Sequence, residues 1–464
     1  MGNALPLSAA PLGSPASPRA ADEWPRREMP VDRALPLVGR IFDAHRDLLG
    51  ILQRLEARHG PVFRTKVARL PVIALLGPDA AELVLRNRDD AFSSRAGWAS
   101  FIDHVFPGAI MAMDNPEHRI HRRIMQAAFT RSALRDYVER MSPAIAARLD
   151  GWVKGRRRAK RAFPVHPALK RLTLDVATST FMGIESGADA DRVSAAFVAA
   201  VAASISIVRL NAWPTPYWRG LQGRKFLVER FRSLLAGKCR ERLPDLFSQM
   251  CHARSDDGER FSDQEIIDHM IFVMMAAHDT STSALTTITY LLAKNPAWQE
   301  RLRAISLGLP GDHLGIDALE GLDEHEWVMM EALRLYPPVA VIPRSTTRMV
   351  EYAGVQIPAG SLVGISPLHT HHLPSLWTTP HRFDPERFSP GRAEQKRHRF
   401  AWTPFGGGGH VCIGQHFAGL EIKTTLHQML RRYRWSVPDR YALSYERLPI
   451  GRPRDGLALR IERL

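Results

Sequence analysis

Residues 404–414 of the chain read PFGGGGHVCIG, in which four consecutive glycines precede a cysteine. The glycines would let the backbone approach a bulky, flat group without clashes from Cβ atoms. The 464-residue chain has only three cysteines, Cys239, Cys251 and Cys412. That number excludes a disulfide framework and favours a reducing compartment, so we expect a cytoplasmic protein in which Cys412 has a chemical role.

The residues that follow Cys412 have the spacing of a helix, with apolar side chains at 413, 417, 420, 426 and 430. Cys412 therefore lies just before a helix start, where unpaired N–H groups and the helix dipole favour a thiolate. Zinc needs four ligands, and no second cysteine or histidine stands at ligand spacing. Haem iron needs one axial ligand from this side, so the loop is predicted to hold a porphyrin. The structural alternative is a glycine loop before a cysteine of the core.

The loop resembles the haem-binding segment of the cytochrome P450 family, Phe-x-x-Gly-x-(Arg/His)-x-Cys-x-Gly. The resemblance implies haem b (iron protoporphyrin IX) as the cofactor and Cys412 as the ligand of its iron, a metal-binding role. It further implies that the residues around the cysteine contact the cofactor, namely Phe405, Gly406, His410 and Gly414.

A second region of resemblance lies in a long predicted helix. The helix begins at Ser262, which forms a capping-box pattern with Glu265, and ends at Asn295-Pro296. Its segment 276–280, AAHDT, resembles the family's small-(Gly/Ala)-x-(Asp/Glu)-Thr pattern, which implies that Asp279 and Thr280 are catalytic and deliver protons to bound dioxygen. Ala277 stands where glycine is more usual, so we expect a tighter local bulge. His278 is expected to be hydrogen-bonded or exposed, and not a ligand.

Two further sets of residues complete the resemblance. Glu331 and Arg334 lie on one face of a helix predicted from about Asp323 to Pro337-Pro338, and with Arg387 they resemble the family's structural triad of one glutamate and two arginines. Four other residues fall where the family binds the haem propionates, and arginine suits such carboxylates. They are His118, Arg122, Arg344 and His410.

The fold class predicted is mainly α with a minor β region, and the resemblance implies the cytochrome P450 fold in a single large domain. Short β segments are expected at 61–67, 72–77, 352–366 and 457–464, with a hairpin turn in VQIPAGS, 355–361. Residues 1–25, rich in Pro, Ala and Ser, are expected to be a flexible tail, and 26–464 the cytochrome P450 domain.

Composition and charge limit the kinds of binding partner that we expect. The net charge is +15, yet no nucleic-acid-binding pattern accompanies it, so no nucleic acid is expected. The most apolar stretch, 193–208, is too short to span a bilayer. At most, peripheral membrane contact is expected, through a lid at 208–220 that carries Trp213 and Trp218. We expect a monomer, a solvated loop at 154–161 and no metal site at the histidine cluster 369–372.

The activity implied by the resemblance is that of a haem-thiolate monooxygenase, an oxidoreductase that inserts one oxygen atom from O2 into a C–H bond by hydroxylation. No flavin or nicotinamide fingerprint is present, so electrons are expected from a ferredoxin and a ferredoxin reductase, docked on basic residues at 395–400 and Lys423. Three alternatives stay open: a haem-thiolate sensor, a peroxygenase that uses hydrogen peroxide, and a helical binding protein without haem.

The substrate is expected to be small and hydrophobic, a terpenoid, steroid or lipid, because the candidate pocket residues are apolar. The segments around Arg334 and Arg387 look closer to the sterol-demethylase and retinoid-hydroxylase branches than to camphor-type members. The pocket candidates are Trp98, Phe101, Phe106, Ile110, Met274, Ala277, Val339, Val341 and Ile450.

Overall fold

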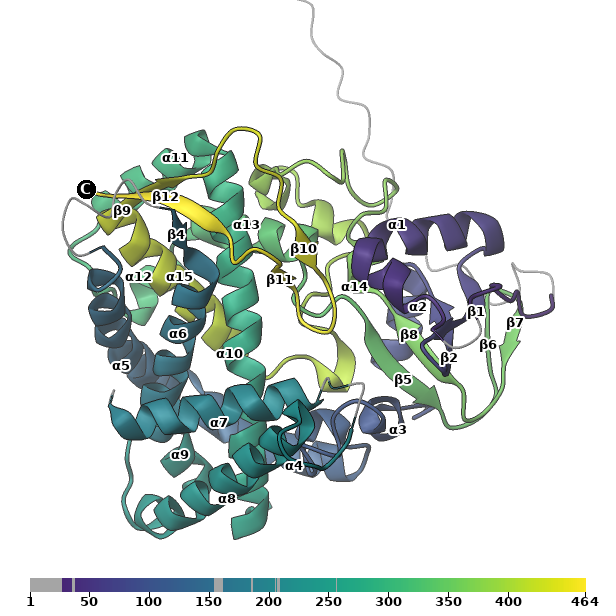
Figure 1. Cartoon of the computed structure of the whole chain (residues 1–464), viewed down its shortest axis with the longest axis horizontal. Coiled ribbons are helices and arrows are strands. Elements are labelled where there is room, and N and C mark those ends of the chain that lie inside the picture. Colours follow the sequence, from purple (N-terminus) through teal and green to yellow (C-terminus); the bar gives the residue numbers. More distant parts are fainter. Residues whose placement is uncertain are drawn as a thin grey trace, which may run out of the picture.

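The computed structural model describes residues 27–35, 38–153, 162–184, 187–204, 206, 209–255 and 257–464. The tail predicted at 1–25 and the loop predicted at 154–161 lie outside the described residues. Figure 1 shows most helices gathered on one side of the molecule and the largest sheet, with α1 (Ile41–His59), on the other. The mainly helical fold with a small β portion is as predicted.

The remaining α-helices cover nearly half of the described chain. They are α2 (Pro78–Arg86), α3 (Ser94–Ala99), α4 (Glu117–Gln126), α5 (Arg131–Asp150), α6 (Val165–Ala177), α7 (Ala188–Ser204), α8 (Pro216–Arg240), α9 (Leu246–His252), α10 (Asp263–Lys294), α11 (Pro296–Leu307), α12 (Ile316–Glu320), α13 (Asp323–Leu335), α14 (Pro367–Thr370) and α15 (Gln415–Arg432).

Helix α10 runs through the middle of the helical side of the molecule (Figure 1). Its predicted capping box is present: the Ser262 hydroxyl accepts from the Glu265 N–H, and the Glu265 carboxylate accepts from the Ser262 N–H at 2.7 Å. The helix continues for 32 residues to Lys294. At 1.5 Å per residue it is about 48 Å long, enough to cross the whole domain. Buried side chains on all its faces make it the central element of the largest hydrophobic cluster.

Five strands form the largest sheet, in the order β1-β2-β8-β5-β3. β1 pairs antiparallel with β2, and β2 pairs parallel with β8, with Ile73 opposite Val363. The sheet thus joins the first part of the chain to a segment almost three hundred residues later. Its strands are β1 (Val62–Val67), β2 (Leu70–Leu75), β3 (Phe92–Ser93), β5 (Ile342–Thr346) and β8 (Leu362–Ile365).

Three smaller sheets complete the β portion. One has the order β4-β12-β9, and the other two are the pairs β6-β7 and β10-β11. Their strands are β4 (Phe163–Pro164), β6 (Val350–Tyr352), β7 (Val355–Ile357), β9 (Tyr433–Ser436), β10 (Tyr445–Glu446), β11 (Arg452–Pro453) and β12 (Ala458–Arg463).

The predicted hairpin turn at 355–361 is wrong. β7 and β8, on either side of it, belong to different sheets, so these residues link two sheets. The hairpin lies earlier, between β6 and β7, where Ala353 and Gly354 have φ of 50° and 73°. Two consecutive left-handed residues make the tight turn that matches the twist of a two-residue hairpin.

The apolar stretch at 193–208 contributes to α7, which packs on α8. Among the described helices, none combines the length and the hydropathy that a membrane crossing requires. Trp213, in the predicted lid, is 77% exposed, and Trp218 is half-buried.

Candidate active site

The loop 404–414 is held against α2 by the conformations of its glycines. Gly406 and Gly408 have φ of 73° and 63°, in the left-handed region that favours glycine. A Cβ on Gly408 would lie 1.8 Å from the Leu85 carbonyl oxygen, whereas one on Gly409 would meet nothing within 4 Å. Close approach of the loop to α2 therefore explains Gly408, although the sequence suggested that a flat ligand was the reason for all four glycines.

Cys412 follows this turn, two residues before the N-cap of α15, Gly414. Its N–H donates to the Phe405 carbonyl oxygen at 2.9 Å, which closes the loop. Desolvation raises the pKa of the Cys412 thiol, while the Gly414 N–H and the Arg122 guanidinium lower it. The expected effect of the helix end is present but weaker than that of burial. A directly bonded cation, as metal ligation supplies, would favour the thiolate.

The Cys412 side chain is exposed even though its thiol is strongly desolvated. A side chain with both properties lines an internal space, because a residue on the outer surface would be hydrated. Near it, the Arg122 Nη1 donates to the Val411 carbonyl oxygen at 2.6 Å, and the rings of His118 and His410 stack with centroids 3.7 Å apart. The two residues predicted on α4 and the loop are thus brought together.

The residues predicted for the propionates are cationic or hydrogen-bond donors, and they lack carboxylate partners. Within the described part of the chain, neither Arg122 nor Arg344 forms an ion pair with a carboxylate. Desolvation and neighbouring positive charges lower the pKa of His118 to about 4 and of His410 to about 3. Desolvation, opposed by the Asp114 carboxylate, lowers the pKa of Arg344 to about 10. Two arginines beside two neutral imidazoles that can donate hydrogen bonds fit a ligand with two carboxylates, and with the Cys412 sulfur they fit haem b.

Asp279 and Thr280 lie side by side on α10 but make different contacts. The Thr280 hydroxyl donates to the Ala276 carbonyl oxygen at 2.7 Å. An Asp279 carboxylate oxygen lies 2.9 Å from Lys170 Nζ on α6. Lys170 was not predicted, because no local pattern links it to a residue 109 positions later.

The expectation for His278 is wrong. The side chain is 1% exposed, and neither ring nitrogen has a hydrogen-bond partner of good geometry among the described residues. Its Nε2 lies 3.3 Å from Asp279 Oδ1, and desolvation lowers its pKa to about 4. His278 is therefore a buried, neutral side chain beside the Asp279 carboxylate.

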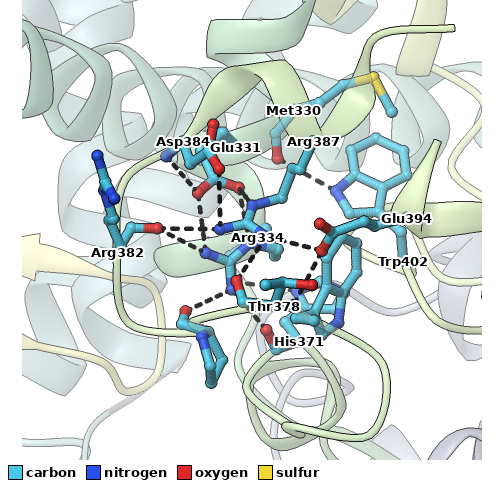
Figure 2. A network of polar contacts seen from close by, with 12 residues as sticks. Met330, Glu331, Arg334, His371, Thr378, Arg382, Asp384, Arg387, Glu394 and Trp402 are labelled. Atoms are coloured by element: carbon cyan, nitrogen blue, oxygen red, sulfur yellow. Dashed lines mark hydrogen bonds and ion pairs between the residues drawn. The ribbon is translucent and has the colours of Figure 1, made fainter. Parts of the chain in front are cut away.

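The three charged residues of the predicted triad meet in the interior, as Figure 2 shows. Arg334 donates through Nε and Nη2 to the two carboxylate oxygens of Glu331 at 2.6 and 2.9 Å. The Arg387 Nε lies 3.1 Å from Glu331 Oε2. All three side chains are fully buried, and one carboxylate contacts two guanidinium groups. Ion pairs in the protein interior are favourable only when the geometry of their contacts is good.

Further residues of this network escaped sequence analysis. Glu394 accepts from the Arg387 Nη1 at 2.8 Å, and Arg334 donates to the His371 carbonyl oxygen at 2.7 Å (Figure 2). The Trp377 ring lies 5.2 Å from the Arg334 Cζ. The His371 Nε2 accepts from the Thr403 N–H at 2.9 Å, which ties the network to the chain just before the glycine loop.

Two imidazoles of the histidine cluster 369–372 have protein partners. His369 bonds to Glu56 at 2.9 Å, and His372 to the Leu368 carbonyl oxygen at 2.8 Å. Among the described residues, no group of three or more His, Cys, Asp or Glu side chains could hold a metal ion.

The candidate pocket residues divide between regions. Phe106, Ile110 and Met274 are buried in the largest hydrophobic cluster, and Trp98 and Ala277 pack against it. All five therefore belong to, or pack against, the cluster that contains α10.

Three of the other four candidates lie elsewhere. Val341 packs, as Leu448 does, against a separate hydrophobic cluster. A hydrogen bond from the Gly451 N–H to the Pro338 carbonyl oxygen, 3.0 Å long, brings Ile450 close to Val339. Phe101 is 36% exposed, so it lies at the edge of the first group.

The comparisons with known proteins agree on one family. The family model described as Cytochrome P450 matches residues 29–455. Cytochrome P450 136 of Mycobacterium tuberculosis (strain ATCC 25618 / H37Rv) is 42% identical over 435 residues, 92% of this chain and 87% of that protein. Pentalenene oxygenase of Streptomyces avermitilis is 30% identical, over 88% of this chain and 91% of its own length. A solved structure, retinoic acid bound cyanobacterial CYP120A1, matches with a TM-score of 0.84 and 26% identity over 95% of this chain and 100% of that one.

Proposed function

The chain belongs to the cytochrome P450 family, whose members are haem-thiolate monooxygenases, and from this premise we propose that it hydroxylates a hydrophobic terpenoid, steroid or lipid. The enzyme is an oxidoreductase and its cofactor is haem b. When bound, the haem supplies the iron at which dioxygen is activated and from which an oxygen atom is transferred.

Cys412 is the proposed ligand of the haem iron. The observation that carries this assignment is a sulfur that is accessible, desolvated and held by the closed loop 405–412 at the start of α15. His118, Arg122, Arg344 and His410 would hold the two propionates, because they are buried or partly buried donors that have no ion pair with a carboxylate among the described residues. Phe405, Gly406 and Gly414 would complete the seat.

Asp279 and Thr280 are proposed to move protons. The Lys170 ammonium holds the Asp279 carboxylate on the α6 side, where solvent can reprotonate it. Thr280 can donate inward once its hydroxyl leaves the Ala276 carbonyl oxygen. This acid and alcohol pair favours a monooxygenase over the sensor and the peroxygenase, neither of which needs protons delivered to dioxygen.

The apolar pocket candidates around α10 support a hydrophobic substrate. Two related proteins carry names that include pentalenene and retinoic acid, and both compounds are isoprenoids. We therefore place an isoprenoid first among the substrate classes.

A ferredoxin with its reductase is the proposed electron donor, and the enzyme is proposed to act as a cytoplasmic monomer. A groove of about 480 Å³ beside the Cys412 loop, whose lining includes Phe405, Gln415 and Trp402, offers a place to dock. Exposed basic residues lie on the segment just before the loop, Lys396 and Arg399 among them. Lys423 lines the same groove, but it is 6% exposed and paired with Glu326 at 3.1 Å, so the free positive charge is expected on the exposed residues of 396–399.

Charge reversal tests the docking. We expect Lys396→Glu with Arg399→Glu to raise the KM for an acidic ferredoxin several-fold and to weaken its salt dependence, at unchanged haem content. The matched control is Lys225→Glu with Arg232→Glu on α8. Equal KM values in the two double variants would show that the ferredoxin does not dock on residues 396–399.

The carbon monoxide difference spectrum tests the assignment of Cys412. The reduced wild-type protein is expected to give the red-shifted Soret band of a thiolate-ligated haem. We expect Cys412→Ser to lose that band, while Cys251→Ser, which changes a buried cysteine of α9, keeps it. A red-shifted band that survives in Cys412→Ser would refute the assignment.

A further inference from the structure

Four of the eight tyrosines of the chain form one continuous run. The ring centroids of Tyr445 and Tyr336 are 5.1 Å apart, those of Tyr336 and Tyr290 6.5 Å, and those of Tyr290 and Tyr441 6.1 Å. Each step joins rings in edge contact, so the four phenols are in van der Waals reach of one another. We call Tyr445, Tyr336, Tyr290 and Tyr441 the tyrosine run.

The inner end of the run touches α10 close to the proposed proton donors. The Tyr445 hydroxyl lies 3.0 Å from the Ser283 hydroxyl, and Ser283 is about one helical turn beyond Thr280. Tyr290 is on the same helix, seven residues after Ser283 and therefore on the same face. Figure 1 shows β10, where Tyr445 lies, beside α10 and α13, the helix that Tyr336 follows.

The outer end of the run has a base. The Tyr441 hydroxyl donates to both carboxylate oxygens of Asp455, at 2.8 and 3.1 Å, in a solvent-exposed contact. Among the described residues, no carboxylate hydrogen-bonds to Tyr290, Tyr336 or Tyr445. A phenol that loses an electron becomes strongly acidic, so the neutral radical is most stable where a carboxylate can take the proton, which is at Tyr441.

A fixed positive charge also disfavours a radical at the inner end of the tyrosine run. The Arg447 Cζ lies 5.2 Å from the centroid of the Tyr336 ring and 5.7 Å from that of Tyr445. A cation over a ring stabilises the neutral, electron-rich ring and disfavours removal of an electron from it. The two inner tyrosines can therefore pass an oxidising equivalent on but are poor places for it to rest.

We propose that the tyrosine run conducts single electrons from Tyr441 at the surface to the active site when dioxygen has been activated and no substrate is there to be oxidised. This function rests on the proposed monooxygenase activity and protects the site from oxidising its own residues.

Tyr441 gives up one electron toward the haem and its hydroxyl proton to Asp455, which leaves a neutral tyrosyl radical, and Asp455 then releases that proton to solvent. A low-molecular-weight thiol returns one electron and one proton to the radical, and two thiyl radicals combine as a disulfide. Two such events supply two electrons, and with two protons from solvent the activated oxygen atom leaves as water.

The experiment uses substrate-free holoenzyme, m-chloroperbenzoic acid as the oxidant and a nitroso spin trap. Freeze-quench electron paramagnetic resonance measures the tyrosyl radical, and mass spectrometry of the trapped protein locates it. In the wild type we expect the adduct on Tyr441. We expect Tyr441→Phe to lose that adduct, and Tyr336→Phe, which breaks the run but keeps the ring, to reduce it several-fold and to increase oxidation of residues near α10.

Tyr352→Phe, in β6 and outside the tyrosine run, is the control and should leave the adduct unchanged. An adduct on Tyr441 that is equally strong in Tyr336→Phe, or a wild-type adduct on tyrosines outside the run, would overturn the proposal. The carbon monoxide spectrum of each sample separates the two hypotheses. A variant with a normal red-shifted band but no change in radical position refutes the tyrosine run alone, whereas a wild type without that band refutes the monooxygenase assignment.

Discussion

At the scale of single residues, the contact between Lys170 and Asp279 has the most direct consequence for chemistry. The two charges are 2.9 Å apart, and the Asp279 side chain is only 13% exposed. An ion pair at this depth is screened less than a surface pair, so it orients the carboxylate toward α6 in the resting protein. Asp279 must then exchange protons on the solvent side before it can serve the interior.

Asp279→Asn is expected to reduce product formation about 10²-fold or more, because an amide cannot pass on a proton. The solvent deuterium isotope effect on turnover should rise, and hydrogen peroxide should replace part of the product. Product, peroxide and oxygen consumed are measured together in H2O and D2O. Asp279→Glu keeps the acid and is the control. Equal isotope effects in wild type and Asp279→Asn would contradict a role in proton transfer.

Single residues also show which parts of a site can be predicted from a sequence. Cys412, Asp279 and Glu331 stand in short patterns whose spacing is chemically specific, so each was predicted as a site residue. Lys170 and Glu394 were missed because their partners lie 109 and 7 positions away without any periodic signal. The pairing of Lys423 with Glu326 was missed as well, because the spacing of residues in two separate helices carries no information on their contact.

At the scale of elements, the loop 404–414 owes its shape to α2. The close approach of Gly408 to the Leu85 carbonyl oxygen fixes where the loop turns, and the Cys412 N–H then closes it on Phe405. The position of the sulfur is therefore set by a helix more than three hundred residues earlier in the chain.

Gly408→Ala is expected to destabilise the protein by about 1–3 kcal/mol from its left-handed φ, with a further cost from the clash with α2. Haem content after purification should fall with it. Gly409→Ala, in the same loop and with open space around its Cβ position, is the matched control. Urea unfolding and haem absorbance per protein measure both effects. Similar losses in the two variants would show that contact with α2 does not shape the loop.

The helices were predicted better than the turns. α10 and α13 have strong ends, a capping box and a pair of prolines, and their bounds lie where the sequence placed them. The turn observed at Ala353–Gly354 was predicted at 355–361, because the proline and glycine there are strong turn signals. Only the assignment of β7 and β8 to separate sheets, a long-range property, reveals the error.

At the scale of the whole molecule, many histidines are buried and neutral. Burial lowers the pKa of His269, His325 and His371 to about 3 each, and all three lie outside the proposed propionate site. In the unfolded chain a histidine has a pKa of about 6.5. Between these values the unfolded state binds more protons than the folded state, so the stability falls as the pH falls below about 6.5.

We expect the free energy of unfolding to drop between pH 6.5 and 5, by about 1.4 kcal/mol per pH unit for each such histidine. Carboxylates with lowered pKa values, such as Glu394, add to the loss only at lower pH. Urea unfolding at pH 7.5, 6.5 and 5.5 measures the slope. His325→Gln, which removes one of these groups, should flatten it, and a wild-type stability that is constant from pH 7 to 5 would contradict the prediction.

The five-stranded sheet has a consequence for synthesis of the chain on the ribosome. The parallel partner of β2 is β8, so Ile73 is synthesised long before Val363, the residue opposite it. At a translation rate of about 5–20 residues per second, roughly 15–60 s pass between the synthesis of these two residues. For that time the edge of β2 is open to pairing with other nascent chains. Chaperone demand should therefore be greatest during translation of the intervening helices, and slower elongation there should increase aggregation.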